Sequence, residues 1–481
     1  MAVFHYILLI IIGIFQIITA GHALLYKRDP RAAWAWIVTC LLLPPFGPLL
    51  YCLLGINRVR TRAKRLKWYW PWFQTDPDCL DDAPAASKHT TTVCDFLTEA
   101  DFHTIAQVSD AVTRKPLLGG NSLQPLFDGE EAYPAMLQAI REAREYIFLS
   151  TFIFDSSRIG HEFIQALEEA KKRSLDIRVL IDGIGEFYTW PRVSKALKDK
   201  GIPFTRFLPP KLNPPSPFIN LRNHRKILVV DGEVGFTGGM NLGLRHMAWE
   251  SDNHNRTRDL HFRVYGPIVN QIEEVFLEDW AFCTGDFHQK PKKPAKDAGQ
   301  AVCRSITVGP NQDLNKLSMI LTGCVSLAKE RISIMTPYFL PTRELIGALQ
   351  GAALKGVEVD IVLPAKNNLP FVHWATQNML WELLQCGVRV FYQPPPFCHS
   401  KLFLIDTIYA QIGSANLDPR SLRLNFELVV EIFDRDFVQG LQRHMDETIS
   451  QSRQTSLVEV DSRTLPVRLR DSVFWLFSPY F

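Results

Sequence analysis

The chain is 481 residues long, a length that corresponds to two or three globular domains. Its hydrophobic residues (47%) and charged residues (21%) exclude a collagen-like, low-complexity or disordered chain, but neither a soluble nor a membrane-attached protein. The formal net charge of +3, from 53 basic and 50 acidic residues, gives no sign of a nucleic-acid binder. The charge is unevenly distributed, because residues 1–67 hold nine Lys or Arg and one acid, and the rest has an excess of five acids.

Residues 1–67 are predicted to form a membrane hairpin. Two stretches of 24 residues, 3–26 and 33–56, contain no formal charge, and each can cross a hydrocarbon core about 30 Å thick. A cleaved signal peptide does not fit, because no Lys or Arg precedes residue 27 and a second apolar stretch follows. The prolines of the second stretch, at positions 44, 45 and 48, predict either a kinked span or a re-entrant loop that never crosses.

The segments that follow the hairpin bear on its orientation. Six basic residues between positions 58 and 67 favour a cytoplasmic body and a cytoplasmic N-terminus, although the basic turn between the two stretches argues weakly for the opposite. Residues 68–114 are predicted to be a linker with an aromatic juxtamembrane segment, which either forms an interfacial belt or packs against the body. That segment contains Trp68, Tyr69, Trp70 and Trp72. The nine cysteines show no C-x-x-C pair or metal-ligand spacing, which argues against a disulfide framework.

An internal repeat organises the remainder of the chain. The apolar, β-rich runs 146–155 and 331–341 are each followed by a helical pattern and a second apolar strand, at 176–182 and 357–364. Both halves therefore have the strand, helix, strand order of an α/β fold with a largely buried sheet. The Lys- and Pro-rich segment 285–299 is predicted to be a linker between a first lobe at 115–285 and a second at 300–481.

The repeat is sharpest in a motif of His, Lys, Asp, a small residue and Asn, with every matched pair 175 residues apart. The first copy is His224, Lys226, Asp231, Gly239 and Asn241, and the second is His399, Lys401, Asp406, Ser414 and Asn416. His and Lys two residues apart share one face of a strand. A turn at Asp231 and Gly232 folds the chain back and sets His224 opposite about Gly239, and the same arithmetic sets His399 opposite Ser414.

Two such patches facing each other have enough groups for phosphodiester chemistry. Two imidazoles can divide the roles of nucleophile and general acid, while two Lys and two Asn can hold an anion with several oxygens. The Lys pair can neutralise charge without a metal, and we find no H-E-x-x-H or EF-hand pattern. We therefore expect no metal and no cofactor. The alternative is that one copy has decayed and only stabilises the fold.

The duplicated H-x-K-x4-D motif resembles that of the phospholipase D superfamily, and the nearer resemblance, over almost the whole chain, is to bacterial cardiolipin synthases. Supporting stretches are the N-terminal hairpin, residues 336–339, residues 416–427 and residues 477–479. The resemblance implies two phospholipase D-like α/β lobes, related by a pseudo-twofold repeat, after a two-helix membrane hairpin.

The resemblance also implies roles for the motif residues. His224 is expected to be the nucleophile that forms a phosphohistidine, and His399 the general acid and base. Lys226, Lys401, Asn241 and Asn416 are expected to hold phosphoryl oxygens, with Gly239 and Ser414 lining the site. Superfamily members also orient each His with a carboxylate further along the chain. Glu427 lies 28 residues beyond His399, and Asp259 is its counterpart in the first copy. Asp231 and Asp406 belong to the catalytic motif, but their turn positions indicate a structural role.

The leading hypothesis is a multi-pass enzyme of the bacterial inner membrane, with a cytoplasmic body, that converts two phosphatidylglycerols to cardiolipin and glycerol. A phospholipase D hydrolase is second, a nuclease third and an inactive scaffold fourth; the acidic body disfavours nucleic acid as a partner. The proline-rich segments 209–221 and 394–396 are predicted to be rims of the entrance or plain surface loops. Four further histidines, His246, His254, His261 and His373, have no partner in the repeat and are assigned to the structure. The sequence leaves the donor preference and the oligomeric state open.

Overall fold

The computed structural model describes residues 2–27, 30–56, 100–210, 220–250, 252–286, 295–310 and 315–478. The chain divides into an N-terminal unit, which comprises residues 1–68 with 210–220, and a larger body made of the remaining residues. The predicted basic cluster at 58–67, the aromatic segment at 68–72 and most of the first proline-rich insertion lie outside the described residues.

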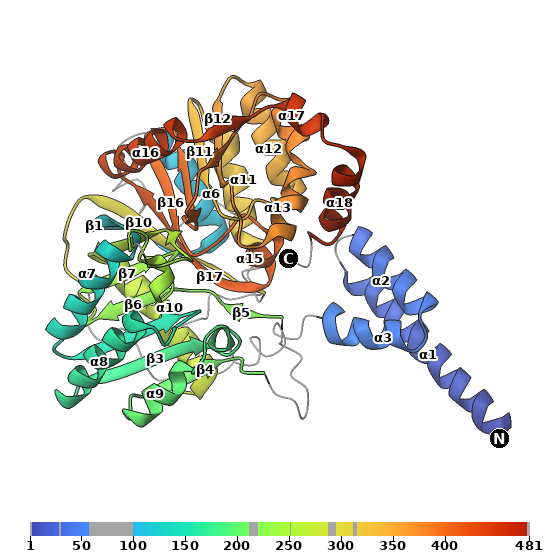
Figure 1. The fold of residues 1–481 in the computed structure, drawn as a ribbon, viewed down its shortest axis with the longest axis horizontal. Helices are drawn as coiled ribbons and strands as arrows, with labels where there is room; N and C mark the ends of the chain where they lie inside the picture. The colour runs from blue at the N-terminus through green and yellow to red at the C-terminus, as the bar shows by residue number, and fades with distance from the viewer. Residues whose placement is uncertain are drawn as a thin grey trace. The chain divides into compact units, whose positions relative to one another are not determined.

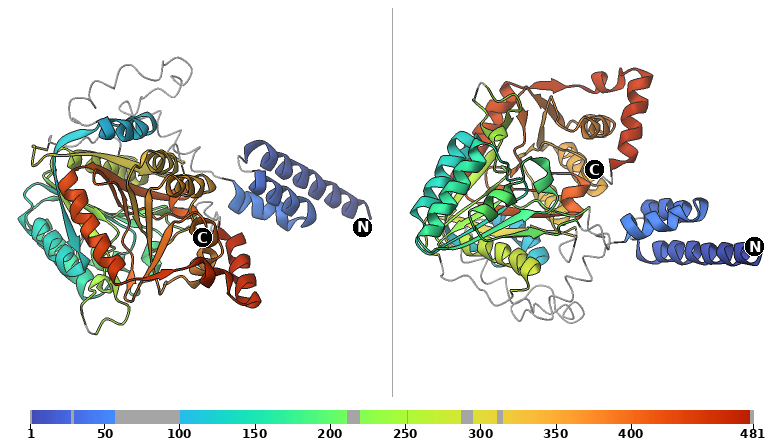
Figure 2. Two further views of the ribbon diagram at one scale, coloured as in Figure 1. Left: turned by 90° about the horizontal axis from the view of Figure 1, so that it is seen from above. Right: turned by 60° about the horizontal axis from the view of Figure 1, so that its bottom comes forward.

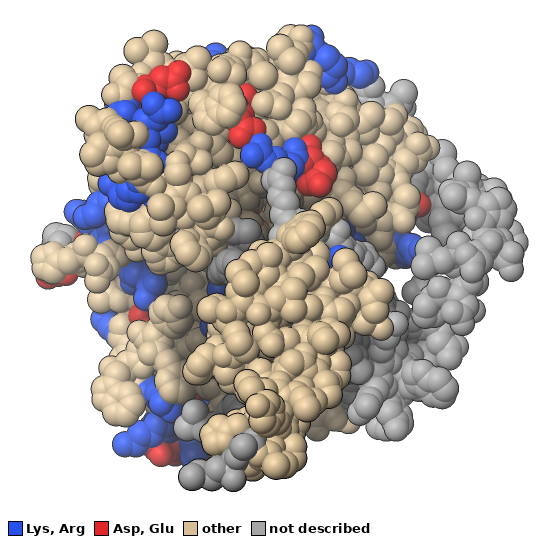
Figure 3. Space-filling view, turned by 90° about the vertical axis from the view of Figure 1, so that its right-hand side faces the viewer, with Lys and Arg blue, Asp and Glu red and all other residues tan. Residues whose placement is uncertain are grey.

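The N-terminal unit contains one long apolar helix and a second, broken one. Helix α1 (Ala2–Tyr26) includes a 24-residue candidate span, within which an 18-residue window has a mean hydropathy of 2.3, and it is long and apolar enough to cross a membrane. Helices α2 (Pro30–Leu42) and α3 (Phe46–Leu50) and the π-helical turn η1 (Tyr51–Gly55) follow. Figure 3 shows the uncharged surface of this unit.

The second predicted stretch, 33–56, does not form one continuous helix. Helix α2 has 13 residues, about 20 Å at 1.5 Å per residue, which is short of a hydrocarbon core. The chain turns after Leu42 because Pro44 and Pro45 cannot donate the backbone hydrogen bonds that would continue the helix. Gly47 permits the turn, since a Cβ there would lie 2.0 Å from the Thr39 carbonyl oxygen. The structure therefore has the break that the prolines predict.

The body is a mixed α/β fold built from two similar halves (Figure 1). Helix α6 (Ala100–Thr113) precedes them. The first half contains β1 (Leu118–Phe127), α7 (Asp128–Glu142), β2 (Tyr146–Thr151), α8 (Arg158–Lys172), β3 (Asp176–Asp182), η4 (Gly185–Tyr188), α9 (Val193–Asp199), β4 (Phe204–Phe207), β5 (Arg222–Asn223), β6 (Ile227–Val230), β7 (Val234–Gly238), η5 (Leu244–His246), β8 (Thr257–Arg258), β9 (Leu260–Tyr265) and α10 (Ile268–Thr284).

The second half repeats this order with additions at its end. It contains β10 (Ala301–Val308), α11 (Lys316–Leu327), β11 (Arg331–Met335), α12 (Arg343–Leu354), β12 (Glu358–Pro364), α13 (Pro370–Gln377), α14 (Leu380–Leu384), β13 (Arg389–Gln393), β14 (Phe397–Cys398), β15 (Leu402–Ile405), β16 (Tyr409–Gly413), α15 (Pro419–Arg423), β17 (Asn425–Phe433), α16 (Arg435–Ser450), β18 (Arg453–Thr455), α17 (Leu457–Asp461) and α18 (Leu465–Leu476).

One continuous sheet passes through both halves. Its order is β18-β13-β12-β11-β15-β16-β17-β10-β1-β9-β7-β6-β2-β3-β4, with β5 paired to β17. The antiparallel pair β1 and β10 joins the halves, with Leu118 opposite Cys303. On each side the order outward from this seam is the same and leads to three parallel strands, and in the second half β18 adds an antiparallel strand at the edge. The predicted α/β fold with two repeated halves is thus confirmed in its strand order, while the exact lobe boundaries stay a prediction.

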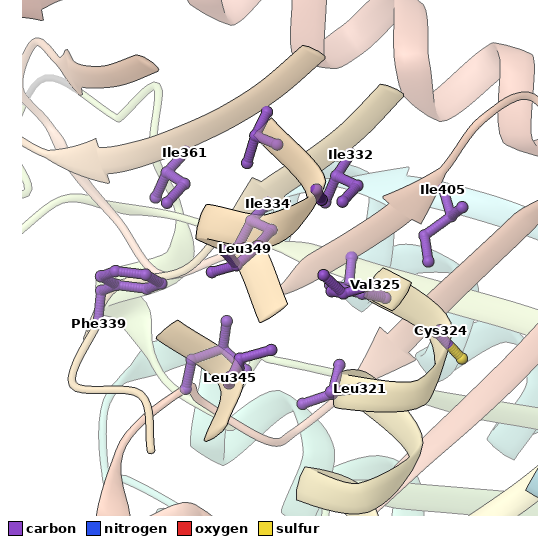
Figure 4. Close-up of a cluster of buried hydrophobic side chains, with 14 of the residues drawn as sticks. Leu321, Cys324, Val325, Ile332, Ile334, Phe339, Leu345, Leu349, Ile361 and Ile405 are labelled. Carbon is purple, nitrogen blue, oxygen red and sulfur yellow. The ribbon is translucent and has the colours of Figure 1, made fainter. Parts of the chain in front are cut away.

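Helices cover both faces of the sheet (Figures 1 and 2), so strands such as β2 are buried on both sides. In β2 every residue is buried: Ile147 and Leu149 belong to the core cluster shared with α7 and α8, while Phe148 stacks on Phe276 of α10. The second half has the equivalent core between α11, α12 and β11, where Ile332 and Ile334 pack (Figure 4). This packing fixes the ends of the strands that position the site residues.

Candidate active site

The two motif histidines lie just ahead of β6 and β15, and short strands from opposite halves position them. Strand β5 pairs in parallel with the start of β17, and the backbone N–H of His224 donates to the Phe426 carbonyl at 2.9 Å. Strand β14 pairs in the same way with β8, and the N–H of His399 donates to the Arg258 carbonyl at 2.7 Å. Each half therefore adds a two-residue strand to the other half, directly before its histidine.

This exchange crosses the histidine and carboxylate pairs between the halves. His224 Nδ1 lies 2.9 Å from Glu427 Oε2, and His399 Nδ1 lies 2.8 Å from Asp259 Oδ2. Both carboxylate side chains are fully buried. A proton held on Nδ1 by a carboxylate leaves Nε2 as the reactive nitrogen. Because neither half holds its own pair, the site is complete only when both halves are folded together.

The two lysines lie beside the histidines in the same buried site. Lys226 Nζ donates to the His224 carbonyl at 2.6 Å, and Lys401 Nζ donates to the His399 carbonyl. Burial lowers the pKa of Lys226 to about 7 and that of Lys401 to about 8, and the charge of Lys401 adds to the lowering of the Lys226 pKa. An anionic phosphate between them would favour both charges and raise both pKa values again.

Burial and neighbouring charges shift the pKa values of the motif imidazoles and their carboxylates. Burial lowers the pKa of His224 below its ordinary value, although the charge of Glu427 opposes this. Burial lowers the pKa of His399 further, and both lysines add to that effect. Burial alone would raise the pKa of Glu427, but His224 and Lys226 reverse this and leave it lowered. For Asp259 burial prevails, and its pKa is raised despite Lys401.

The small and amide residues of the motif lie around these pairs. Gly239 permits the approach of Asp259, because a Cβ at this glycine would lie 2.3 Å from Asp259 Oδ1. The carbonyl oxygen of Ser414 lies 3.2 Å from His224 Nδ1. Asn241 Oδ1 accepts the Ile153 N–H at 3.1 Å, whereas the buried Asn416 Oδ1 has no hydrogen-bond partner among the described residues.

Comparisons with known proteins identify the family of this chain. Residues 136–280 and 321–449 match the family described as "Cardiolipin synthase, PLD-like domain", and residues 8–55 match "Phospholipase D-nuclease N-terminal". The chain belongs to the phospholipase D-like cardiolipin synthase family. It is 31% identical to cardiolipin synthase 1 of Staphylococcus epidermidis, with 98% of this chain and 97% of that protein covered. It is 29% identical to a cardiolipin synthase of Staphylococcus aureus, with 94% and 92% covered.

A solved structure supports the fold of this cardiolipin synthase family member. The phosphatidylserine synthase of Haemophilus influenzae aligns with a TM-score of 0.60 at 16% sequence identity, and the alignment covers 78% of this chain and all of that chain. At this identity the likeness concerns the fold. The 78% coverage shows that the larger part of the chain shares it.

Asp231 and Asp406, grouped with the catalytic motif by sequence, lie at the hairpin turns and not beside the histidines. Both adopt positive φ, 55° and 51°, and each carboxylate accepts three consecutive backbone N–H groups at the start of a central strand. The donors are Arg144, Glu145 and Tyr146 for Asp231, and Lys329, Glu330 and Arg331 for Asp406. Each Asp lies seven positions beyond its His, at the far end of a four-residue strand, which sets the two roughly 20 Å apart. These two residues of the family motif therefore serve the fold.

Sequence reasoning set aside a third histidine that lies at this site. His246 is buried, its Nδ1 lies 3.9 Å from Asp259 Oδ2, and its ring centroid lies 6.3 Å from that of His399. Its Nε2 accepts the Asn241 N–H at 3.3 Å, which assigns the proton to Nδ1. The position matched to His246 in the second copy is Ser421. The repeat itself could have indicated this residue, because a His follows the motif Asn by five residues in the first copy and not in the second.

Aromatic side chains lie next to the two histidines, and the sequence did not identify them as residues of the site. The Phe152 ring centroid lies 5.2 Å from that of His224, while Tyr338 and Phe397 lie 6.4 Å and 6.0 Å from His399. Within the described ranges no group of three or more His, Cys, Asp or Glu could hold a metal ion.

Proposed function

We propose that this protein is a cardiolipin synthase that transfers the phosphatidyl group of one phosphatidylglycerol to a second one and releases glycerol. The crossed pairs, His224 with Glu427 and His399 with Asp259, support the proposal most directly. They supply two imidazoles with free Nε2 atoms in one buried site that also holds two lysines. The cardiolipin synthases of staphylococci that match almost the whole chain support the same reaction.

In the first step, Nε2 of His224 attacks the phosphorus of the donor lipid. The N–P bond forms as the bond from phosphorus to the glycerol oxygen breaks, and protonated His399 gives its proton to that oxygen. The pKa of His399 is low in the empty site because of burial and the two lysine charges. An anionic phosphodiester offsets those charges and raises the pKa of His399 again, so substrate binding prepares the general acid.

In the second step, neutral His399 removes a proton from a glycerol hydroxyl of the second phosphatidylglycerol. That oxygen attacks the phosphorus, the N–P bond breaks, and His224 is released with cardiolipin as the product. Lys226, Lys401, Asn241 and Asn416 hold the phosphoryl oxygens through both steps. The unpartnered Asn416 Oδ1 is available to accept a hydrogen bond from a lipid hydroxyl.

We further propose that α1 spans the bacterial inner membrane and that the body is cytoplasmic. The 24 apolar residues of α1 support a single crossing, and the six basic residues between 58 and 67 favour the cytoplasmic side after the hairpin. Helix α2 has only 13 residues. The second stretch therefore crosses the membrane, and makes the protein multi-pass, only if α3 and η1 add to the length of α2.

Lipid analysis tests this function. Purified full-length protein is incubated with phosphatidylglycerol vesicles, and the lipids are resolved by mass. Cardiolipin and glycerol in equal amounts are expected. Phosphatidic acid without cardiolipin would instead establish a hydrolase, since water would then have replaced the lipid alcohol.

A further inference from the structure

A loop after β3 exposes three large aromatic side chains beside the site. Phe187, Tyr188 and Trp190 have 52%, 62% and 85% of their surface exposed. Side chains of this size ordinarily bury most of their area, and a cluster of exposed ones marks a surface that meets something else. We call residues 185–192 the aromatic loop.

The base of the aromatic loop is firmly held, so the exposure of its tips does not come from loose structure. Asp182 Oδ1 accepts the N–H groups of Ile184 and Gly185 at 2.9 Å and 2.7 Å. The buried Glu186 carboxylate accepts a hydrogen bond from Arg206 at 2.6 Å. At the far end of the loop, the Ser156 hydroxyl donates to the Pro191 carbonyl. Trp190, with 85% of its surface exposed, therefore gains little from packing within the body.

The loop is connected to the reacting groups through one ring. Tyr188 packs edge-on against Phe152 at 5.7 Å, and Phe152 packs against His224 at 5.2 Å, measured between ring centroids. A close backbone approach supports this arrangement, because a Cβ at Gly185 would lie 1.8 Å from the Phe152 carbonyl oxygen. The aromatic loop is therefore separated from His224 by a single ring, that of Phe152.

We propose that the aromatic loop inserts into the headgroup region of an anionic lipid bilayer and presents a phosphatidyl headgroup to His224. Trp and Tyr rings favour this region because one end is apolar and the other can hydrogen-bond. The guanidinium of Arg192 lies 4.0 Å from the Phe187 ring centroid, which places a cation among the aromatic tips and suits anionic phosphates.

A bilayer fits this surface better than a protein partner for two reasons. The loop borders a site whose substrates, on the proposed function, are themselves bilayer lipids, so the inference rests on that function. The same chain also contains α1, which is long enough to be held in that bilayer. Because α1 would already hold the protein in the membrane, the role of the loop would be to orient the body on the bilayer surface.

The test compares Trp190→Ala with Trp381→Ala, a control that removes an exposed tryptophan from α14. Full-length proteins are reconstituted into vesicles of phosphatidylcholine and phosphatidylglycerol. Activity is measured on this vesicle lipid and on short-chain phosphatidylglycerol dissolved as monomers in detergent-free buffer. Trp190→Ala should lower kcat/KM on vesicle lipid about tenfold, the equivalent of losing part of one buried aromatic ring. It should change the rate on monomeric lipid less than twofold, and Trp381→Ala should change neither.

A second measurement does not depend on turnover. Vesicle lipids brominated near the headgroup should quench the tryptophan fluorescence of the unaltered protein more than that of Trp190→Phe, because only the former has Trp190 in the bilayer. Equal quenching in the two proteins would overturn the proposal, as would equal loss of activity on both substrates. If the unaltered protein forms no cardiolipin but the quenching difference is present, the proposed function fails and the docking surface stands.

Discussion

The two half-sites share their plan but differ around the carboxylates. Glu427, which holds His224, accepts a hydrogen bond from Asn425 at 3.1 Å, and its pKa is lowered by His224 and Lys226 despite burial. Asp259, which holds His399, accepts the Leu260 N–H at 2.8 Å and lies near His246, but burial raises its pKa. The carboxyl group that pairs with His224 is therefore ionised more readily than the one that pairs with His399.

This difference suits a division of labour. A firm carboxylate on Nδ1 increases the electron density at Nε2 and stabilises the positive charge that develops when His224 attacks phosphorus. A weaker carboxylate leaves His399 with a lower proton affinity, so that it can release its proton to the leaving alkoxide. The asymmetry supports His224 as nucleophile independently of its position in the chain.

The largest expected effect comes from removing either imidazole, and the leaving group separates their roles. His224→Ala should lower cardiolipin formation by roughly 10⁴-fold or more, and His399→Ala by roughly 10³-fold. With phosphatidyl p-nitrophenol as donor, whose leaving group needs no proton, a burst of p-nitrophenol should return in His399→Ala but not in His224→Ala. A burst in His224→Ala alone would reverse the assignment.

The carboxylates test the crossing between the halves. Glu427→Gln should slow formation of the phosphoenzyme from either donor, by as much as roughly 10³-fold, because the amide can hold His224 in the wrong tautomer. Asp259→Asn should slow the reaction of phosphatidylglycerol comparably but spare the burst with phosphatidyl p-nitrophenol, because its effect passes through His399. Rapid-quench measurement of the phosphoenzyme compares the two variants. The opposite pattern would show that each histidine works with the carboxylate of its own half.

Part of the fold and of the site could be predicted from the sequence, and part could not. The repeated strand, helix, strand pattern predicted the α/β halves. The duplicated motif predicted the histidines and lysines that the structure brings together, because identical spacings at 175 residues specify identical hairpins. The crossing was not predictable, since β5 and β14 are two residues long and their pairing partners lie in the other half. Such short strands show no periodicity. The aromatic loop could not be predicted either, because its exposure depends on the tertiary contacts of Asp182 and Glu186.

His246 gives the smallest effect and the most specific one. Its Nδ1–H dipole, 3.9 Å from Asp259 Oδ2, favours the ionised carboxylate, and loss of this imidazole should raise the pKa of Asp259 further. Because His399 is oriented by the ionised form of Asp259, the acid limb of the kcat/KM profile should move to higher pH in His246→Leu, with about a threefold to tenfold loss near neutral pH.

The other charged groups that act on His246 are His399, Lys401 and Arg245, and all three are retained in the variant. His246→Gln, which keeps an N–H donor, should restore part of the shift, and His254→Leu, at an exposed position, should cause none. Thermal unfolding of each variant separates this effect from lost packing. If His246→Leu lowers the rate equally at every pH, the imidazole only fills space and the two half-sites differ in shape rather than in electrostatics.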